Sequence, residues 1–129
     1  MERRTISTGT SWEARVGYSR AVRIGPHVWV AGTTALDETG QVVGDDAYAQ
    51  TAFILKKIGA ALEGAGAGLG DVVRTRIFLT DVAHAEGAGR AHGEVFGGVR
   101  PASTMLAVGA LVSPEMLVEV EADAFIGGA

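Results

Sequence analysis

The sequence predicts an α+β fold in which two helices cover one face of a sheet. A chain of 129 residues is the size of one domain, so residues 1–129 are expected to form a single domain. Its composition, 47% hydrophobic and 20% charged, is typical of a folded protein. The predicted elements follow the order strand, strand, strand, helix, strand, helix, strand, strand, which favours an antiparallel or mixed sheet.

The N-terminal part predicts three strands. Residues 1–8 alternate weakly and predict an edge strand, whereas residues 9–17 predict a loop. Residues 18–24 and residues 27–32 alternate between apolar and polar positions and are joined by a Gly-Pro pair. This pattern predicts a hairpin.

The segment from Ala47 to Glu63 predicts the first helix, with Asp45 or Asp46 as its N-cap. Apolar side chains that recur at intervals of three and four residues form one stripe: Tyr48, Ala52, Leu55, Ile58 and Leu62. Gln50 is expected on the opposite side. The helix is therefore expected to cover a sheet.

A further strand and the second helix are predicted from residue 72 onward. Val72–Thr80 predicts a strand whose two faces carry Val73, Thr75, Ile77 and Leu79 on one side and Arg74, Arg76 and Phe78 on the other. The second helix is expected from about Ala83 to Phe96, capped by Asp81. The two arginines need anionic partners, and Glu119 and Glu121 are the candidates if the strands share a sheet.

Residues 100–126 carry the most informative pattern, two apolar strands joined by a short turn that contains a proline. Glu119, Glu121 and Asp123 occupy every second position of the second strand. A charge at every second position of an apolar strand is costly unless that face meets water, a ligand or a positive partner. We therefore expect this face to meet one of these three partners, and a structural salt bridge to Arg74 or Arg76 is one way to do so.

The composition excludes several classes of function. With no cysteine and three scattered histidines, neither a metal site nor a cofactor is expected. A formal net charge of −4 argues against nucleic-acid binding. No apolar run reaches the roughly 18 residues of a membrane span, and no signal segment follows Met1. We therefore expect a cytoplasmic protein that does not enter a membrane.

Four segments resemble one protein family. Residues 101–104 (Pro-Ala-Ser-Thr) and residues 117–122 (Leu-Val-Glu-Val-Glu-Ala) are similar to the C-terminal signature of the Rid family. These reactive-intermediate deaminases are also called YjgF/UK114-type or endoribonuclease L-PSP proteins. Residues 17–22 and residues 30–33 resemble the N-terminal segments of that family. The resemblance covers nearly the whole chain from residue 17 to residue 126.

The resemblance implies a chorismate-mutase-like fold of the bacillus type, a homotrimer with small-molecule clefts between subunits, and hydrolytic deamination of imine or enamine intermediates. Glu119 would position the attacking water, and Tyr18 and Gly32 would line the cleft. The family usually reads Pro-Ala-Arg-Ser, so its substrate-binding arginine falls on Ser103. The chain is therefore expected to act weakly on simple 2-iminoacids.

Several alternatives stay open at this point. Arg100 or Arg20 would restore the missing charge, although Arg100 precedes a proline and is expected to be extended. His92 is the best general acid or base by its intrinsic pKa, yet a lone helix histidine is more often a surface or capping residue. Tyr18 is equally consistent with a structural role at a subunit edge. A non-catalytic module that binds a small metabolite in the same clefts is the alternative to an enzyme.

Overall fold

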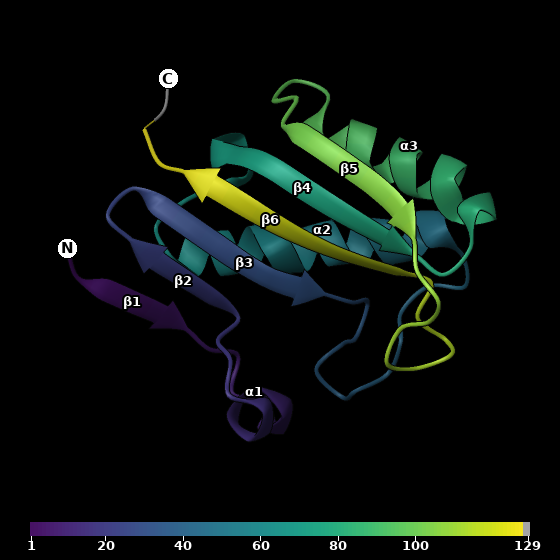
Figure 1. Cartoon of the computed structure of the whole chain (residues 1–129), viewed down its shortest axis with the longest axis horizontal. Helices are drawn as coiled ribbons and strands as arrows, with labels where there is room; N and C mark the ends of the chain where they lie inside the picture. Colours follow the sequence, from purple (N-terminus) through teal and green to yellow (C-terminus); the bar gives the residue numbers. More distant parts are fainter. Residues whose placement is uncertain (128–129) are drawn as a thin grey trace.

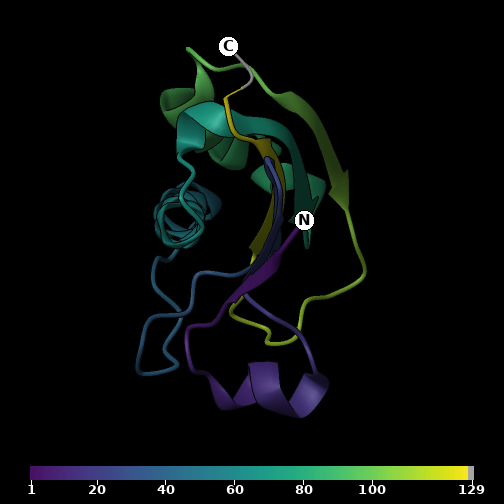
Figure 2. The same cartoon turned by 90° about the vertical axis from the view of Figure 1, so that its left-hand side faces the viewer.

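The computed structural model describes residues 1–127, which form a mixed six-stranded sheet with the two longer helices packed on one face (Figures 1 and 2). The strands are β1 (Arg3–Ile6), β2 (Ala21–Ile24), β3 (His27–Thr33), β4 (Val72–Leu79), β5 (Ala102–Ala107) and β6 (Val118–Phe125). The α-helices are α1 (Ser11–Val16), α2 (Ala47–Gly64) and α3 (Ala85–Phe96). This architecture confirms the predicted α+β class.

The spatial order of the strands is β1-β2-β3-β6-β4-β5, so β6 lies in the middle of the sheet although it is the last strand of the chain. Only β4 and β5 pair in parallel; the other neighbours in the described part of the chain are antiparallel. β5 and β6 therefore lie on opposite sides of β4. The prediction of a short turn between β5 and β6 is therefore wrong, because residues 108–117 must cross the end of β4 to join them.

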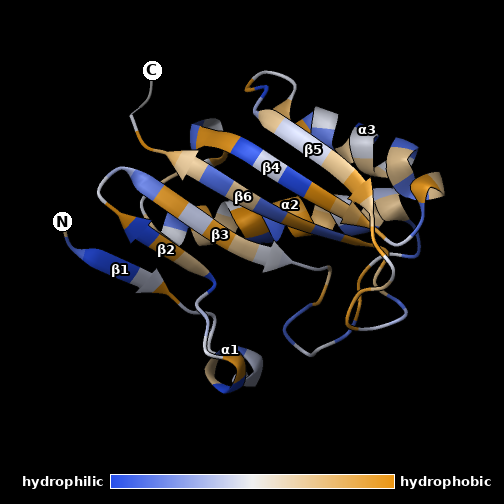
Figure 3. Ribbon diagram, in the orientation of Figure 1, coloured by the Kyte–Doolittle hydropathy of each residue, from blue (hydrophilic) through white to orange (hydrophobic). Residues whose placement is uncertain are grey.

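The core lies between the sheet and the helices α2 and α3 (Figure 2). Strand β6 shows why the sequence alternates, since Val118, Val120, Ala122 and Ala124 are buried against the helices. Glu119, Glu121 and Asp123 point to the opposite face. Figure 3 shows the same alternation as hydrophilic and hydrophobic bands along β4 and β6. The predicted carboxylate face is therefore confirmed.

Helix α2 begins as predicted, because the side chain of Asp46 accepts a hydrogen bond from the Ala49 amide at 2.8 Å. Its buried stripe is rotated from the predicted one. Ala52 is exposed and Tyr48 is only half-buried, whereas Ile54 and Gln50 are buried. Periodicity alone misassigned Gln50, because a polar side chain can be buried when its hydrogen bonds are satisfied.

The buried carboxamide of Gln50 joins α2 to two loops. Its Nε2 donates to the carbonyl of Gly44 at 3.1 Å and to that of Glu115 at 2.9 Å. Its Oε1 accepts from the amide of Leu117 at 2.9 Å. The segment that leads into β6 is therefore tied to the helix immediately before Glu119.

The predicted loop at residues 9–17 contains the short helix α1, so that prediction is wrong. Thr10 caps this helix by accepting from the Glu13 amide. The side chain of Glu13 is buried and accepts hydrogen bonds from Ser7, Thr8 and Thr10. These bonds stabilise a helix that is too short to show an apolar period.

Two further boundaries differ from the prediction. Asp81 caps a short 3-10 turn at Val82–His84, and α3 begins only after it. In β4 the register against β6 shifts between Val72 and Arg74, so Val73 is exposed instead of joining the buried face. No helix within residues 1–127 is long and apolar enough to cross a bilayer.

Candidate functional site

The carboxylate of Glu119 lies against the backbone of Gly32. The register between β3 and β6 shifts between Val30 and Thr33, which places Gly32 in a bulge beside Glu119. A Cβ atom on residue 32 would collide with Oε2 of Glu119, so any larger residue here would force the carboxylate to move. Two predicted site residues that are far apart in sequence are therefore in contact.

Arg20 and Tyr18 extend this cluster from the segment before β2. Nη2 of Arg20 donates to the carbonyl of Gly32 at 2.5 Å, and the Arg20 guanidinium lies 5.7 Å from the centre of the Tyr18 ring. Nε of Arg20 is buried without a hydrogen-bond partner among residues 1–127. Four predicted site residues thus form one group, which we call the Glu119 cluster: Tyr18, Arg20, Gly32 and Glu119.

The environment of Glu119 favours its protonated form. Burial raises the pKa of Glu119, the Arg20 guanidinium opposes this rise, and Glu121 adds to it. The net pKa is above the usual value of 4.5. A half-buried carboxyl with a raised pKa is suited to exchange a proton with a ligand or a water.

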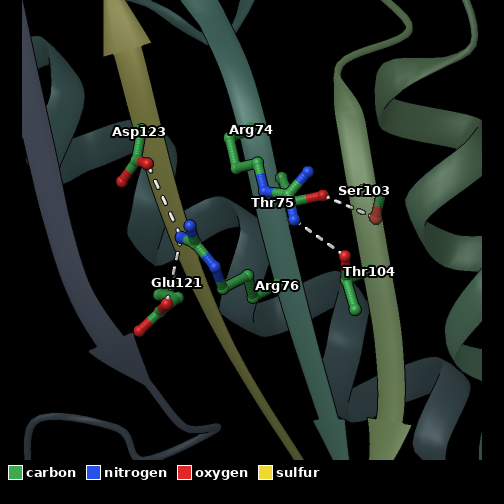
Figure 4. Close-up of polar contacts among 7 residues, drawn as sticks. All are labelled: Arg74, Thr75, Arg76, Ser103, Thr104, Glu121 and Asp123. Carbon is green, nitrogen blue, oxygen red and sulfur yellow. Dashed lines mark hydrogen bonds and ion pairs between the residues drawn. The ribbon is translucent and has the colours of Figure 1, made fainter.

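The ion pairs on the same sheet face involve other carboxylates (Figure 4). Nη1 of Arg76 lies 3.2 Å from Oε1 of Glu121 and 3.5 Å from Oδ2 of Asp123. Nη2 of Arg74 instead donates to Oγ1 of Thr104 at 2.9 Å. The expected pairing of the two arginines with Glu119 and Glu121 is therefore only half right, because neither arginine pairs with Glu119 in the described residues.

Ser103 of β5 and His92 of α3 are linked through Thr75 of β4 at a second place. Oγ1 of Thr75 donates to Oγ of Ser103 at 2.8 Å and lies 2.9 Å from Nε2 of His92 (Figure 4 shows the first contact). Burial lowers the pKa of His92. We call Ser103, Thr75 and His92 the hydroxyl–imidazole chain. Thr75 was not predictable as a site residue from the sequence, because only the parallel register of β4 and β5 places it beside Ser103.

The Glu119 cluster and the hydroxyl–imidazole chain lie on opposite faces of the sheet in one chain. Thr75 and Ser103 are register partners that point toward the helices, whereas Glu119 lies opposite Phe78 on the other face. One copy of the chain therefore does not bring Ser103 and Glu119 into a common site.

Arg100 lies in neither group. It is exposed, and its backbone has a φ of 56°, so the extended conformation expected before Pro101 is wrong. Its amide donates to the carbonyl of Phe96 at 2.8 Å and so closes the end of α3. The local need to end the helix overrides the preference that the proline imposes.

A hollow of about 860 Å³ lies on the outer sheet face. Its walls include Arg3, Tyr18, Trp29, Arg76, Glu121 and Asp123. Glu119 and Ser103 are not part of these walls, so the hollow of a single chain does not enclose the predicted site. No three His, Asp or Glu side chains within residues 1–127 are arranged to hold a metal ion.

Together the mixed sheet, its two covering helices and the glycine bulge below a carboxylate define a class of small α+β proteins, and comparison with known proteins identifies the family. Residues 8–126 match the family model described as endoribonuclease L-PSP. The chain belongs to this family, which includes the YjgF/UK114 and Rid proteins. The resemblance stated from the sequence is therefore confirmed.

Individual relatives agree with this membership. An uncharacterized protein of Streptomyces coelicolor is 37% identical over 96% of this chain and 92% of its own length. The crystal structure of a YjgF/YER057c/UK114 family member from Mycobacterium tuberculosis is 50% identical, with a TM-score of 0.90 over 97% of this chain and all of that one. A Rid family protein of Yersinia pestis is 29% identical, with a TM-score of 0.86, and covers 97% of this chain and 100% of that chain.

Proposed function

We propose that the protein hydrolyses reactive imine or enamine intermediates in clefts between the subunits of a homotrimer. The observation that carries this proposal is Glu119, a half-buried carboxyl with a raised pKa that lies over Gly32 outside the ion pairs of its sheet face. Such a group can hold a water and take its proton. The membership of the Rid family supports the same substrate class.

In this mechanism Glu119 orients a water toward the imine carbon. As the water oxygen bonds to that carbon, the carboxylate takes one proton from the water. The proton then passes to the nitrogen, which gives a carbinolamine. Transfer of the hydroxyl proton of the carbinolamine to the nitrogen lets the C–N bond break as the C=O bond forms, and the products are a carbonyl compound and ammonia or an amine. An enamine enters the same path after it has tautomerised to the imine. Arg20 holds the carbonyl of Gly32 and thereby keeps the bulge, and Glu119 above it, in position.

Assembly is part of the proposal, because Ser103 and Glu119 face opposite sides of one sheet. A cleft that contains both needs residues from two copies of the chain. The outer sheet face also leaves Trp29 and Phe125 exposed at 43% and 38% beside the charged row. Apolar surface of this kind favours association. We expect a chorismate-mutase-like trimer, and light scattering at micromolar concentration that gave a monomer mass would contradict it.

A non-catalytic module that binds a metabolite in the same clefts is the second candidate. It is favoured by Ser103, a neutral hydroxyl at the position where the family pattern has its substrate-binding arginine. The nuclease activity named in the family description is not proposed, because a net charge of −4 gives little attraction for phosphates.

The decisive experiment compares Glu119→Gln with Glu63→Gln, an exposed carboxylate at the end of α2. A panel of imines and enamines, neutral and anionic, is generated in situ and their decay is followed. Loss of a general base is expected to lower the accelerated rate by about 100-fold or more in Glu119→Gln and to leave Glu63→Gln unchanged. Binding without accelerated decay in the wild type would favour the non-catalytic module.

A further inference from the structure

The hydroxyl–imidazole chain connects an exposed hydroxyl to a covered imidazole. Ser103 is exposed at the start of β5, Thr75 is fully buried, and His92 is half-buried on α3. The two contacts of the Thr75 oxygen, 2.8 Å to Ser103 and 2.9 Å to His92, are both within hydrogen-bond distance. The position of the Ser103 hydroxyl is therefore determined by two side chains behind it.

This chain can present either a donor or an acceptor to a ligand. A hydroxyl donates one hydrogen bond and accepts others, and a neutral imidazole has one N–H and one lone pair. If His92 donates to Thr75, the Ser103 hydrogen is free for a ligand; if Thr75 donates to His92, the Ser103 oxygen accepts from a ligand. Burial lowers the pKa of His92, so the imidazole is neutral at neutral pH.

Neither arginine of β4 is directed toward Ser103. Arg74 donates to Thr104 on the opposite face, and Arg76 is held by Glu121 and Asp123. The next residue of β5 on the same side as Ser103 is Met105, an apolar side chain that lies close to Gly89 of α3. A carboxylate that is desolvated at Ser103 would therefore gain no cation from β4, whereas an uncharged amide or ketone would need none.

We propose that Ser103, positioned by Thr75 and His92, recognises an uncharged carbonyl or amide group of the ligand and discriminates against a carboxylate at this place. The inference rests on the clefts of the proposed function but does not depend on turnover. Ser103 is the contacting residue, and Thr75 and His92 are positioning residues. The ligand class is a small molecule whose polar end at Ser103 is neutral.

The test measures binding of pyruvamide and pyruvate, which differ in the charge of one end, by ligand-observed NMR at pH 7.5. Pyruvamide is expected to bind at least about tenfold more tightly to the wild type, because the carboxylate of pyruvate has no charge-assisted hydrogen-bond partner at Ser103. Ser103→Arg should reverse the preference. Equal or tighter binding of pyruvate, or no measurable binding of pyruvamide, would overturn the proposal.

Two threonine variants separate positioning from packing. Thr75→Val keeps the shape but removes the hydroxyl, and should weaken pyruvamide binding about fivefold to tenfold with pyruvate unaffected. Thr75→Ser keeps the hydroxyl and should retain the preference. If both variants bound pyruvamide as the wild type does, the chain would have no role in recognition.

Two outcomes separate this inference from the proposed function. The preference for pyruvamide is a difference in binding, so it should be measurable even if the protein hydrolyses no imine or enamine. Arg100→Ala should keep this preference, because Arg100 is exposed and has no assigned contact at Ser103. A preference that is lost in Arg100→Ala would contradict recognition by Ser103, whatever the effect on turnover.

Discussion

Glu119 occupies the space that a side chain on Gly32 would fill, so the carboxylate and the glycine bulge form one unit. The bulge interrupts the pairing of β3 with β6 at this point. Bulges near active sites commonly direct a side chain. Here the bulge makes room for the carboxyl of Glu119, whose pKa is raised. Substitution of either Gly32 or Glu119 therefore tests the arrangement directly.

The first prediction concerns Gly32→Ala. The new methyl group would displace the carboxylate of Glu119, so turnover or ligand affinity should fall by about tenfold or more, while the free energy of unfolding should change little because the colliding atom is the end of a flexible side chain. Steady-state kinetics and urea unfolding measure the two effects. Gly70→Ala is the control, because a Cβ at that position meets no atom within 4 Å. Unchanged kinetics in Gly32→Ala would contradict the assignment.

The second prediction is a pH dependence of stability that Glu119→Gln removes. The pKa of Glu119 in the folded protein lies above the usual value of 4.5, so the folded state binds this proton more tightly than the unfolded state does. The wild type should therefore lose stability relative to Glu119→Gln as the pH rises from about 4.5 through the folded pKa. Urea unfolding of both proteins between about pH 4 and pH 8 measures this difference. A difference that is constant with pH would show that the pKa of Glu119 is not raised.

The third prediction concerns the buried carboxamide of Gln50. Replacement by leucine leaves two carbonyls and one amide without their partner, at a cost of about 1–3 kcal/mol for each group that water cannot reach. We expect the free energy of unfolding to fall by about 2–4 kcal/mol in Gln50→Leu. The exposed Gln41→Leu should change it by less than about 0.5 kcal/mol. Similar midpoints for the two variants would contradict a structural role of Gln50.

The fourth prediction is weak deamination of simple 2-iminoacids. Ser103 supplies a neutral hydroxyl at the position where the family pattern has an arginine, and a charge-assisted hydrogen bond is worth roughly 1 to 2 kcal/mol more than a neutral one. A deficit of about tenfold to a hundredfold in specificity follows. Iminoacids generated by an amino-acid oxidase, with an arginine-bearing relative for comparison, provide the assay. Decay as fast as with that relative would defeat the prediction.

Arginine variants would then identify the replacement. Arg20 contacts the carbonyl of Gly32 beside Glu119, whereas Arg100 is exposed beyond α3. If the wild type were fast, we would expect Arg20→Ala to lose that activity and Arg100→Ala to keep it.

The sequence by itself determined the order of the strands and of the two long helices, the α+β class and the charged face of β6, because these depend on local periods. Alternation at every second residue separates Val118 and Val120 from Glu119 without any knowledge of the partner strands. The cap at Asp46 was readable for the same reason, since a cap acts within one turn, whereas Asp81 caps the 3-10 turn ahead of α3 instead of the helix itself. The motifs around Glu119 and Ser103 were sufficient to indicate the family.

Only the tertiary structure decided which of these residues meet, because strand register and bulges depend on contacts between distant segments. The bulge at Gly32 brings Arg20 to Glu119, and the parallel pairing of β4 with β5 brings Thr75 to Ser103. No local pattern contains either contact. The burial of Gln50 likewise depends on two loops that its carboxamide joins, so the polar character of the residue was not sufficient to place it on the surface.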